Sequence, residues 1–365
     1  MQLFAAVFII LSGFYFIILL LIMLGLKRLK IKSTQVQPTI SVLIAARNEA
    51  SRIRPGLESL SRLNYHSDRF EIIYVDDASS DGTVDIIEKY SDKFENWKLI
   101  CLKNKSTEMP GKKNALNEAL KVATGELIFT TDADCQVPPD WLTNMTAYFD
   151  PGTHMVLGHS PLQVKKGFAG IFLAFDNLFS AIVAAAPAKL GFAHTSVGRN
   201  LAYRRSEIDQ IDGYKALKKF RSGDDVHLTE RFRRKSAGKI DYCAHPATFV
   251  ETLPPSTTRE IFHQQIRKNS KVLKKSWPTV FLSILLFITY MMFMFLPLVL
   301  STLSGLWIVI IIIKTLLEFT ALTHAAFVFR KKKLIPWFLF FQLIYPFYVI
   351  TFSLLGALQI YEWKK

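Results

Sequence analysis

Two long apolar regions bracket this 365-residue chain and constrain its fold more than any other feature. Residues 3–26 form a run of about 24 residues without a charged side chain, and residues 277–362 are nearly all apolar. Because about 20 apolar residues span a bilayer as a helix, both regions predict membrane-spanning helices. The middle of the chain has an ordinary globular composition, so we expect one soluble domain flanked by membrane segments.

The apolar regions predict about four spans. One lies in residues 1–27. Three more lie in residues 278–360, at 281–300, 306–328 and 334–357. A cleaved signal peptide is the alternative for the first span, but its apolar core is too long, it has no basic leading segment, and no small-residue cleavage site follows it.

The placement of basic residues predicts the orientation. The net charge is +15, and much of it lies in clusters beside the apolar runs, at 27–32 and 330–333. Both clusters fall on the side of the soluble domain, which predicts a cytoplasmic catalytic domain; the final Lys364-Lys365 pair is a mild exception. The same placement favours anionic lipid headgroups as partners over nucleic acid.

The remaining ionisable and sulfur-bearing residues are interpreted as structural. Lys314 and Glu318 are four residues apart within a predicted span, so a mutually paired couple is favoured over a transport site. The three cysteines show no metal-ligand spacing, and we expect reduced thiols in a cytosolic domain. No phosphate-binding loop of the G-x-x-x-x-G-K-[ST] type occurs, which argues against an NTPase.

Strands alternate with helices between residues 40 and 130. Expected strands are 40–45, 71–75, 98–102 and 127–130, with a late strand at 247–251. Expected helices are 51–63, 83–90, 111–123 and 226–235, followed by a basic helix at 259–275. The alternation predicts an α/β fold with a mostly parallel, doubly wound sheet.

Residues 167–187 are apolar enough to resemble a further span. Asp176 and Asn177 lie in the middle of this run. A span here would separate the polar loops before it from those after it across the membrane. We therefore favour a helix at the membrane interface or packed under the domain.

Polar loops follow three of the expected strands, at 46–49, 76–81 and 132–134. In doubly wound sheets, ligands bind beyond the carboxyl ends of the strands. Asp132 and Asp134 lie on what we take to be an extended chain, where alternate side chains point the same way. Two carboxylates this close favour a divalent cation between them and a substrate phosphate. The alternative is a turn, where aspartate is common.

Five motifs, in order, resemble those of membrane-bound, inverting family-2 glycosyltransferases with a GT-A fold. They are Ser41–Glu49, Val75–Thr83, Gly111–Asn117, Thr131–Asp134 and Gly223–Asp225. The resemblance covers roughly residues 38–270. It implies transfer of a hexose from a nucleotide diphosphate sugar such as a UDP-sugar, with Mg²⁺ or Mn²⁺, to a lipid or polysaccharide acceptor, in a bacterial plasma membrane. Three C-terminal spans favour a single addition over processive synthesis.

The resemblance also assigns roles to individual residues. Asp225 would be the general base, and Asp134 with Asp132 would hold the metal ion. Donor contacts would come from Glu49, Asp77, Lys112, Asp132, Gln264 and Arg267. Acceptor contacts would come from Gly198, Asn200 and Asp224.

Each assignment has a structural alternative. Aspartates at turns and helix starts are common caps, an interpretation we accept for Asp76 and Asp81. Arg267 is equally explained as the solvated face of a basic helix. The chain also departs from the family at Lys268, where a tryptophan is usual, and at Ala45, where proline is frequent. An inactive membrane scaffold with the same fold is the alternative function.

Overall fold

The chain is described by a computed structural model in two compact units. The described residues are 2–103, 109, 111–163, 167–218, 220, 223–255, 257–270, 277–299 and 304–358. The globular unit runs from Arg28 to Pro254, and the helical unit joins Met1–Lys27 to Pro255–Lys365.

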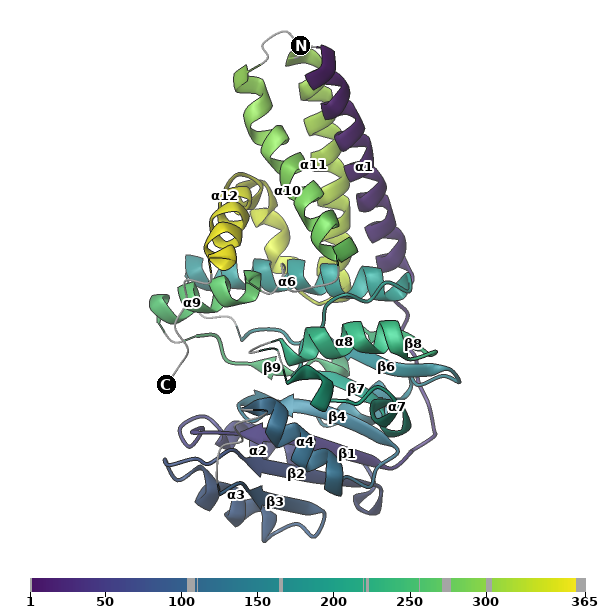
Figure 1. Cartoon of the computed structure of the whole chain (residues 1–365), viewed down its shortest axis with the longest axis vertical. Helices are drawn as coiled ribbons and strands as arrows, with labels where there is room; N and C mark the ends of the chain where they lie inside the picture. The colour runs from purple at the N-terminus through teal and green to yellow at the C-terminus, as the bar shows by residue number, and fades with distance from the viewer. Residues whose placement is uncertain are drawn as a thin grey trace. The chain divides into compact units, whose positions relative to one another are not determined.

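A seven-stranded sheet forms the centre of the globular unit, in the order β3-β2-β1-β4-β7-β6-β8 (Figure 1). The strands are β1 (Ile40–Ala46), β2 (Phe70–Asp76), β3 (Trp97–Cys101), β4 (Leu127–Asp132), β6 (Thr153–Gly158), β7 (Leu201–Arg204) and β8 (Lys239–Cys243). Strands β3, β2, β1 and β4 are parallel, β7 is antiparallel to β4 and β6, and β6 is parallel to β8. This arrangement confirms the predicted α/β class and its mostly parallel sheet.

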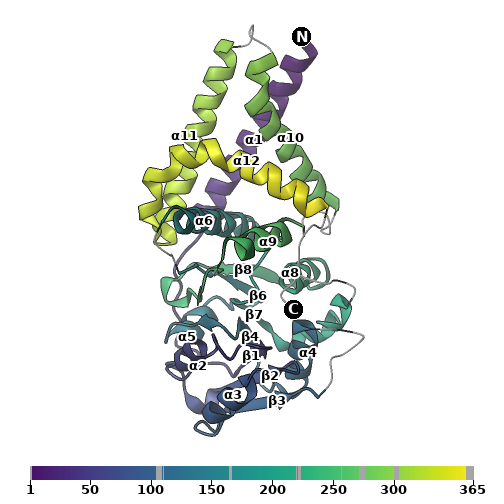
Figure 2. The same cartoon turned by 90° about the vertical axis from the view of Figure 1, so that its left-hand side faces the viewer.

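Helices cover both faces of the sheet (Figure 2). On one face lie α2 (Arg54–Leu60) and α5 (Trp141–Thr146), and on the other lie α4 (Lys112–Val122) and α8 (Asp224–Lys235). The short helices α3 (Thr83–Ser91) and α7 (Arg205–Gln210) follow β2 and β7. Strands β1, β2 and β4 are almost continuously apolar and buried, as expected for parallel strands covered on both faces. Phe129 of β4 packs edge-on against the buried Trp141 of α5.

The second half of the sheet differs from the sequence prediction. Strands β6, β7 and β8 were not expected, because each has only four to six residues. The strand expected at 247–251 is wrong. Residues Pro246–Thr248 form a 3₁₀ turn, and only the two-residue strand β9 (Glu251–Thr252) follows, paired with β5 (Cys135–Gln136).

Helix α6 (Phe168–Lys189) belongs to the globular unit and contacts β8. Polar bonds also tie it there, because Asn177 Nδ2 donates to the Ser160 carbonyl at 3.0 Å and Lys189 pairs with Asp241 at 2.6 Å. It is long and apolar enough to cross a membrane. These contacts agree with the prediction of a helix packed against the domain.

The helical unit contains α1 (Gln2–Lys27), α9 (Thr258–Asn269), α10 (Trp277–Val299), α11 (Ser304–Val328) and α12 (Phe338–Ala357). Helix α1 runs beside α11, and α9 packs against α12 (Figure 1). Helices α1, α11 and α12 are long and apolar enough to span a bilayer, and α10 is also apolar. Residues 271–276, where the predicted basic helix was to continue, lie outside the described residues.

One polar cluster joins four helices of this unit. Lys314 and Glu318 of α11 form the expected ion pair, at 2.9 Å. Glu318 also accepts a hydrogen bond from Tyr15 of α1 at 2.5 Å and one from Tyr290 of α10 at 3.4 Å. Gln342 of α12 bonds to both members of the pair. The pair is therefore part of a satisfied four-helix network, as a structural role requires.

Candidate active site

Strand register brings polar residues to one edge of the sheet. Ala45 pairs with Asp132 and Ala46 with Asp76, so the carboxyl ends of β1, β2 and β4 coincide. Antiparallel β7 begins at the same edge, because Leu201 pairs with Thr130. The segment before β7 therefore lies beside the end of β4.

Two glycines with positive φ precede the helices that carry the other charged residues of this edge. Gly111, at φ +76°, precedes α4 and places Lys112 as its first residue. Gly223, at φ +83°, precedes α8 and places Asp224 and Asp225 in its first turn. Other residues are strained in this conformation, so both glycines are required where the chain turns sharply into each helix. The acidic first turn of α8 also suits the helix dipole, so a capping role and a catalytic role are compatible there.

These segments meet in one place. Lys112 Nζ forms an ion pair with Asp132 at the end of β4. The backbone N–H of Gly198 donates to Asp225 Oδ2 at 3.1 Å, and the Gly198 carbonyl accepts from Thr130 Oγ1 at 2.9 Å. A side chain on Gly198 would meet Asp225 Cβ at 3.1 Å and Lys112 Nζ at 3.6 Å. Residues that lie more than 90 positions apart in the sequence, Asp132 and Asp225, thus share one site around Lys112 and Gly198.

The charges at this site are coupled. Burial alone would raise the pKa of Asp132, but the charge of Lys112 and its hydrogen bond outweigh burial, so the pKa is lowered. Burial alone would lower the pKa of Lys112, but Asp132, Asp224 and Asp225 raise it well above the ordinary value. Asp132 and Lys112 therefore remain charged at neutral pH.

Asp134 lies in a turn, which corrects the expectation of an extended chain. Residues 133–134 form the turn between β4 and β5. The carboxylates are nevertheless close, since ligand atoms of Asp132, Asp134 and Cys135 lie within 4.8 Å of one another. Burial and the charge of Asp132 raise the pKa of Asp134. A cation at this point would relieve that repulsion.

The donor set fits a hard divalent cation. Burial raises the pKa of Cys135, so its sulfur remains a thiol that donates to Asp134 Oδ1 at 3.7 Å. Two carboxylates without a thiolate suit Mg²⁺ or Mn²⁺ better than Zn²⁺. The predicted pair Asp132 and Asp134 therefore fits the expected metal ion. Cys135 lies beside this pair, although the spacing of the cysteines in the sequence did not indicate a metal site.

The loops after β1 and β2 are bonded to each other. Asn48 has a φ of +52°. Its backbone N–H donates to Ser79 Oγ, and its side-chain Oδ1 accepts from the Ser80 N–H, both at 2.9 Å. Glu49 donates from its backbone to Thr83 Oγ1 at 2.8 Å. Asp77 is buried and faces Arg47 at 3.5 Å. Donor contacts by Glu49 and Asp77 stay predictions.

Asp76 and Asp81 have the structural roles that were expected of them. Asp76 accepts hydrogen bonds from the backbone and side chain of Ser79. Asp81 accepts from the Ala50 backbone at 3.0 Å and from Thr83 at the start of α3. Both carboxylates are therefore used to build turns.

Asn200 is a framework residue, and this geometry argues against the predicted acceptor contact. Its side chain is 0% exposed. The amide nitrogen donates to the carbonyls of His159 and Thr248, both at 2.7 Å, and the amide oxygen accepts from Trp141 Nε1 at 3.0 Å. This side chain holds three segments together and leaves no donor for a substrate.

Sequence reasoning did not single out Arg199 or Lys113. Arg199 Nε donates to Ser160 Oγ at 2.6 Å, and its charge lowers the pKa of Asp132. Lys113, the residue after Lys112, is buried and donates to the carbonyls of Leu217 and Phe220, ahead of α8. The only sequence signal for either residue is its position beside a motif residue.

The predicted donor residues Gln264 and Arg267 lie on α9 of the helical unit. Gln265, between them, is buried and accepts a hydrogen bond from Tyr348 of α12 at 2.8 Å. The nucleotide contacts of Gln264 and Arg267 stay predictions.

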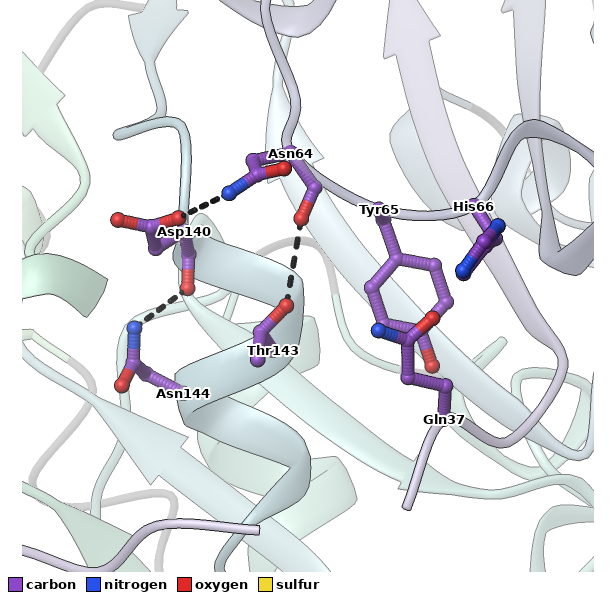
Figure 3. A pocket seen from close by; sticks show the side chains of 7 residues that line it. All are labelled: Gln37, Asn64, Tyr65, His66, Asp140, Thr143 and Asn144. Carbon is purple, nitrogen blue, oxygen red and sulfur yellow. Dashed lines mark hydrogen bonds between the residues drawn. The ribbon is translucent and has the colours of Figure 1, made fainter. Parts of the chain in front are cut away.

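A hollow of about 320 Å³ lies at the opposite edge of the sheet (Figure 3). Its lining comes from the segments before β1 and β2 and from the start of α5: Gln37, Asn64, Tyr65, His66, Asp140, Thr143 and Asn144. Asn64 donates to Asp140 at 2.9 Å, and its carbonyl accepts from Thr143 at 3.3 Å (Figure 3). None of the predicted site residues lines this hollow.

Comparison with known proteins shows what this chain resembles. Residues 41–206 match Glycosyl transferase family 2. The probable glycosyltransferase YdaM of Bacillus subtilis is 32% identical over 205 residues, which are 53% of this chain and 46% of that protein. The beta-monoglucosyldiacylglycerol synthase of Synechocystis sp. is 33% identical over 248 residues, 64% of this chain and 48% of that protein. The chain thus spans about half the length of these relatives.

A solved structure confirms the fold. The mannosyltransferase PcManGT from Pyrobaculum calidifontis, in complex with GDP-Man and Mn²⁺, covers 97% of this chain with a TM-score of 0.57. The alignment covers 96% of that chain, and the sequences are 22% identical. The fold is therefore of the GT-A type, as predicted, and residues 41–206 are similar in sequence to glycosyltransferase family 2.

Proposed function

We propose that the protein is an inverting glycosyltransferase that moves a hexose from a nucleotide diphosphate sugar to a hydroxyl of a lipid acceptor. The single observation that carries this proposal is the convergence of the ion pair between Lys112 and Asp132 with Asp225 in a domain similar to glycosyltransferase family 2. Lys112 can stabilise an anionic leaving group, and Asp225 can accept the proton of a hydroxyl.

On the donor side, Lys112 is the cation that approaches the diphosphate. Its ammonium group is held by Asp132 and remains protonated at neutral pH, so it can stabilise the charge that develops on the departing diphosphate. Asp132 and Asp134 would hold a divalent cation, Mg²⁺ or Mn²⁺, which supplies Lewis-acid stabilisation of the same oxygens when bound.

On the acceptor side, Asp225 is the general base. Its carboxylate is fixed by the Gly198 N–H and lies at the first turn of α8. The acceptor oxygen attacks the anomeric carbon, the bond from that carbon to the diphosphate oxygen breaks, and the hydroxyl proton passes to Asp225. Attack on the face opposite the diphosphate inverts the anomeric centre. Such a base contributes about 10²–10⁴-fold to the rate.

A lipid acceptor is favoured by the chain's own composition and by one relative. Helices α1, α11 and α12 are long and apolar enough to anchor the enzyme in a bilayer, as a lipid substrate requires. The Synechocystis relative is named for the synthesis of a glucosyldiacylglycerol. We propose a catalytic domain on the cytoplasmic face of a bacterial plasma membrane, with spans in residues 1–27 and 278–360.

The test is release of nucleoside diphosphate by the purified full-length protein in detergent. A panel of UDP- and GDP-sugars is supplied with Mn²⁺ or Mg²⁺ and with diacylglycerol. We expect turnover with at least one donor, and a fall of about 10²–10⁴-fold in Asp225→Asn. Full turnover in that variant would contradict the assignment of the base. Nucleotide-sugar binding without turnover on a broad acceptor panel would favour the inactive scaffold.

A further inference from the structure

We propose that Arg199 is a phosphate-binding residue of this site, and that its guanidinium binds a phosphate group of a substrate beside Asp132 and Asp134. The inference rests on the proposed function, because it adds a ligand contact to the same site. It concerns a residue that no motif of the sequence assigns.

The chain places Arg199 at the correct edge of the sheet. Its neighbour Gly198 is fixed by Thr130 and Asp225, and its other neighbour Asn200 is fully buried in a hydrogen-bonded framework. Both flanking positions are therefore anchored, which limits where the arginine side chain can reach.

Ser160 then orients the guanidinium. The hydroxyl of Ser160 donates to the Val250 carbonyl at 2.6 Å and accepts from Arg199 Nε at 2.6 Å. Ser160 itself is buried, and its carbonyl is bonded to Asn177 of α6. An arginine held through Nε presents its two terminal amino groups on the opposite side as a fork.

That fork is available for a ligand. Among the described residues, no carboxylate forms an ion pair with Arg199, although its charge acts on both Asp132 and Asp134. Arg47, Arg204 and Arg231 of the same unit each face an acidic partner. Arg199 is instead partly exposed, near two carboxylates that suit a metal ion. A planar fork beside a metal site matches the geometry of phosphate oxygens, which arginine binds in a bidentate manner.

Two substrate groups have this chemistry. One is the diphosphate of the sugar donor, and the other is a phosphate carried by a lipid acceptor. The experiment separates them by using probes that carry one or the other.

Calorimetric titration of the full-length protein in detergent, with Mn²⁺ present and absent, tests the proposal without requiring turnover. The donor probes are inorganic pyrophosphate, UDP and GDP, with uridine and guanosine as phosphate-free controls. The acceptor probes are phosphatidic acid and diacylglycerol in the same micelles. We expect Arg199→Gln to weaken binding of one phosphate-bearing set by about 10- to 100-fold. Loss with pyrophosphate, UDP and GDP identifies the donor diphosphate, and loss with phosphatidic acid alone identifies an acceptor phosphate.

Further variants guard against a folding defect. Arg199→Lys keeps the charge without the fork, so we expect a smaller loss than in Arg199→Gln. Ser160→Ala removes the oxygen that orients the guanidinium and should weaken the same probes by a few-fold. Arg62→Gln, at an exposed arginine of the same unit, is the matched control and should bind as the wild type does.

Two results would overturn the proposal. One is a folded Arg199→Gln protein whose affinity for every phosphate-bearing probe stays within twofold of the wild type. The other is a wild type that binds none of these probes. If turnover is absent but pyrophosphate binding still depends on Arg199, the proposed function fails while this inference stands.

Discussion

Charged side chains have different surroundings at the two edges of the parallel half of the sheet. At the amino edge, Glu71 of β2 is 7% exposed and is bonded to neighbours on three sides. It accepts from Ser41 Oγ at 2.6 Å, from the backbone and side chain of Thr124, both at 2.7 Å, and from Lys98 at 2.7 Å. These bonds join the starts of β1, β2 and β3 to the residues just before β4.

At the carboxyl edge, charges gather instead around the ion pair between Lys112 and Asp132. Lys112 faces Asp132 and is also under the influence of Asp224 and Asp225, and Arg199 adds a further positive charge. The pKa values show the contrast. Hydrogen bonds outweigh burial at Glu71 and lower its pKa to about 2, whereas burial and the charge of Asp132 raise the pKa of Asp134. A carboxylate satisfied by the chain stabilises the fold, and a carboxylate destabilised by it is suited to a metal ion.

Removing the metal site should have the largest effect of the tests that follow. We expect Asp134→Ala, or chelation of divalent ions in the wild type, to reduce turnover by at least 10²-fold, because the leaving diphosphate loses its Lewis acid. Nucleoside diphosphate release measures the effect. Asp150→Asn, at an exposed aspartate of the same unit, should keep full activity. Activity that persists in EDTA would show that the reaction does not need a divalent metal ion.

Two lysines that each pair with a carboxylate allow a matched test of the two edges. Lys112→Met should lower turnover by about 10- to 100-fold, because it removes a cation beside the leaving group. Lys98→Met, at the amino edge, should lower the melting temperature slightly and leave turnover at the wild-type level. The test measures the turnover and the melting temperature of both variants. Equal turnover in both variants would show that the edges are not distinct.

Glu71→Gln should cost stability in a pH-dependent manner. The folded-state pKa of about 2 lies below the unfolded value near 4.3, so the stabilising contribution is complete above about pH 5 and is lost as the pH falls towards 2. At pH 7 we expect a loss of roughly 2–3 kcal/mol in the free energy of unfolding. Thermal unfolding in detergent, followed by tryptophan fluorescence at pH 7 and pH 2.5, measures it. A deficit of the same size at both values would contradict the charge-based explanation.

The smallest effect is expected at the hollow of the amino edge. Asn64→Ala removes the side-chain hydrogen bond to Asp140, at the amino edge rather than the carboxyl edge of the sheet. We expect a stability change of about 1 kcal/mol and unchanged kinetic constants. A rise of tenfold or more in the Michaelis constant for the sugar donor would place substrate at this hollow instead.

The sequence predicts the half of the sheet in which strands alternate with helices. Strands of continuous apolar residues, separated by helices, were identifiable for β1 to β4, because such strands are buried on both faces. Strands β6 to β8 are short, and their pairing depends on contacts distant in sequence, which local patterns do not encode. The helix predicted at 51–63 is confined to residues 54–60, and Pro55 lies in its first turn, where a helix tolerates proline.

The site was predictable where a residue stands within a motif, and otherwise was not. The placement of Lys112 and Asp225 depends on Gly111 and Gly223, whose positive φ turns the chain into each helix. The resemblance assigned Asn200 an acceptor contact, and the sequence alone did not show that its side chain is fully buried. Arg199 and Lys113 were missed because their partners, Ser160 and the carbonyls of Leu217 and Phe220, are distant in sequence.

The most direct test is an experimental structure of the protein with a nucleoside diphosphate and Mn²⁺. We expect the ion on the carboxylates of Asp132 and Asp134, the diphosphate within reach of Lys112, and the Asp225 carboxylate facing the space beyond the diphosphate. Nucleotide bound in the hollow beside Asn64 and Asp140, with the carboxyl edge empty, would contradict this expectation.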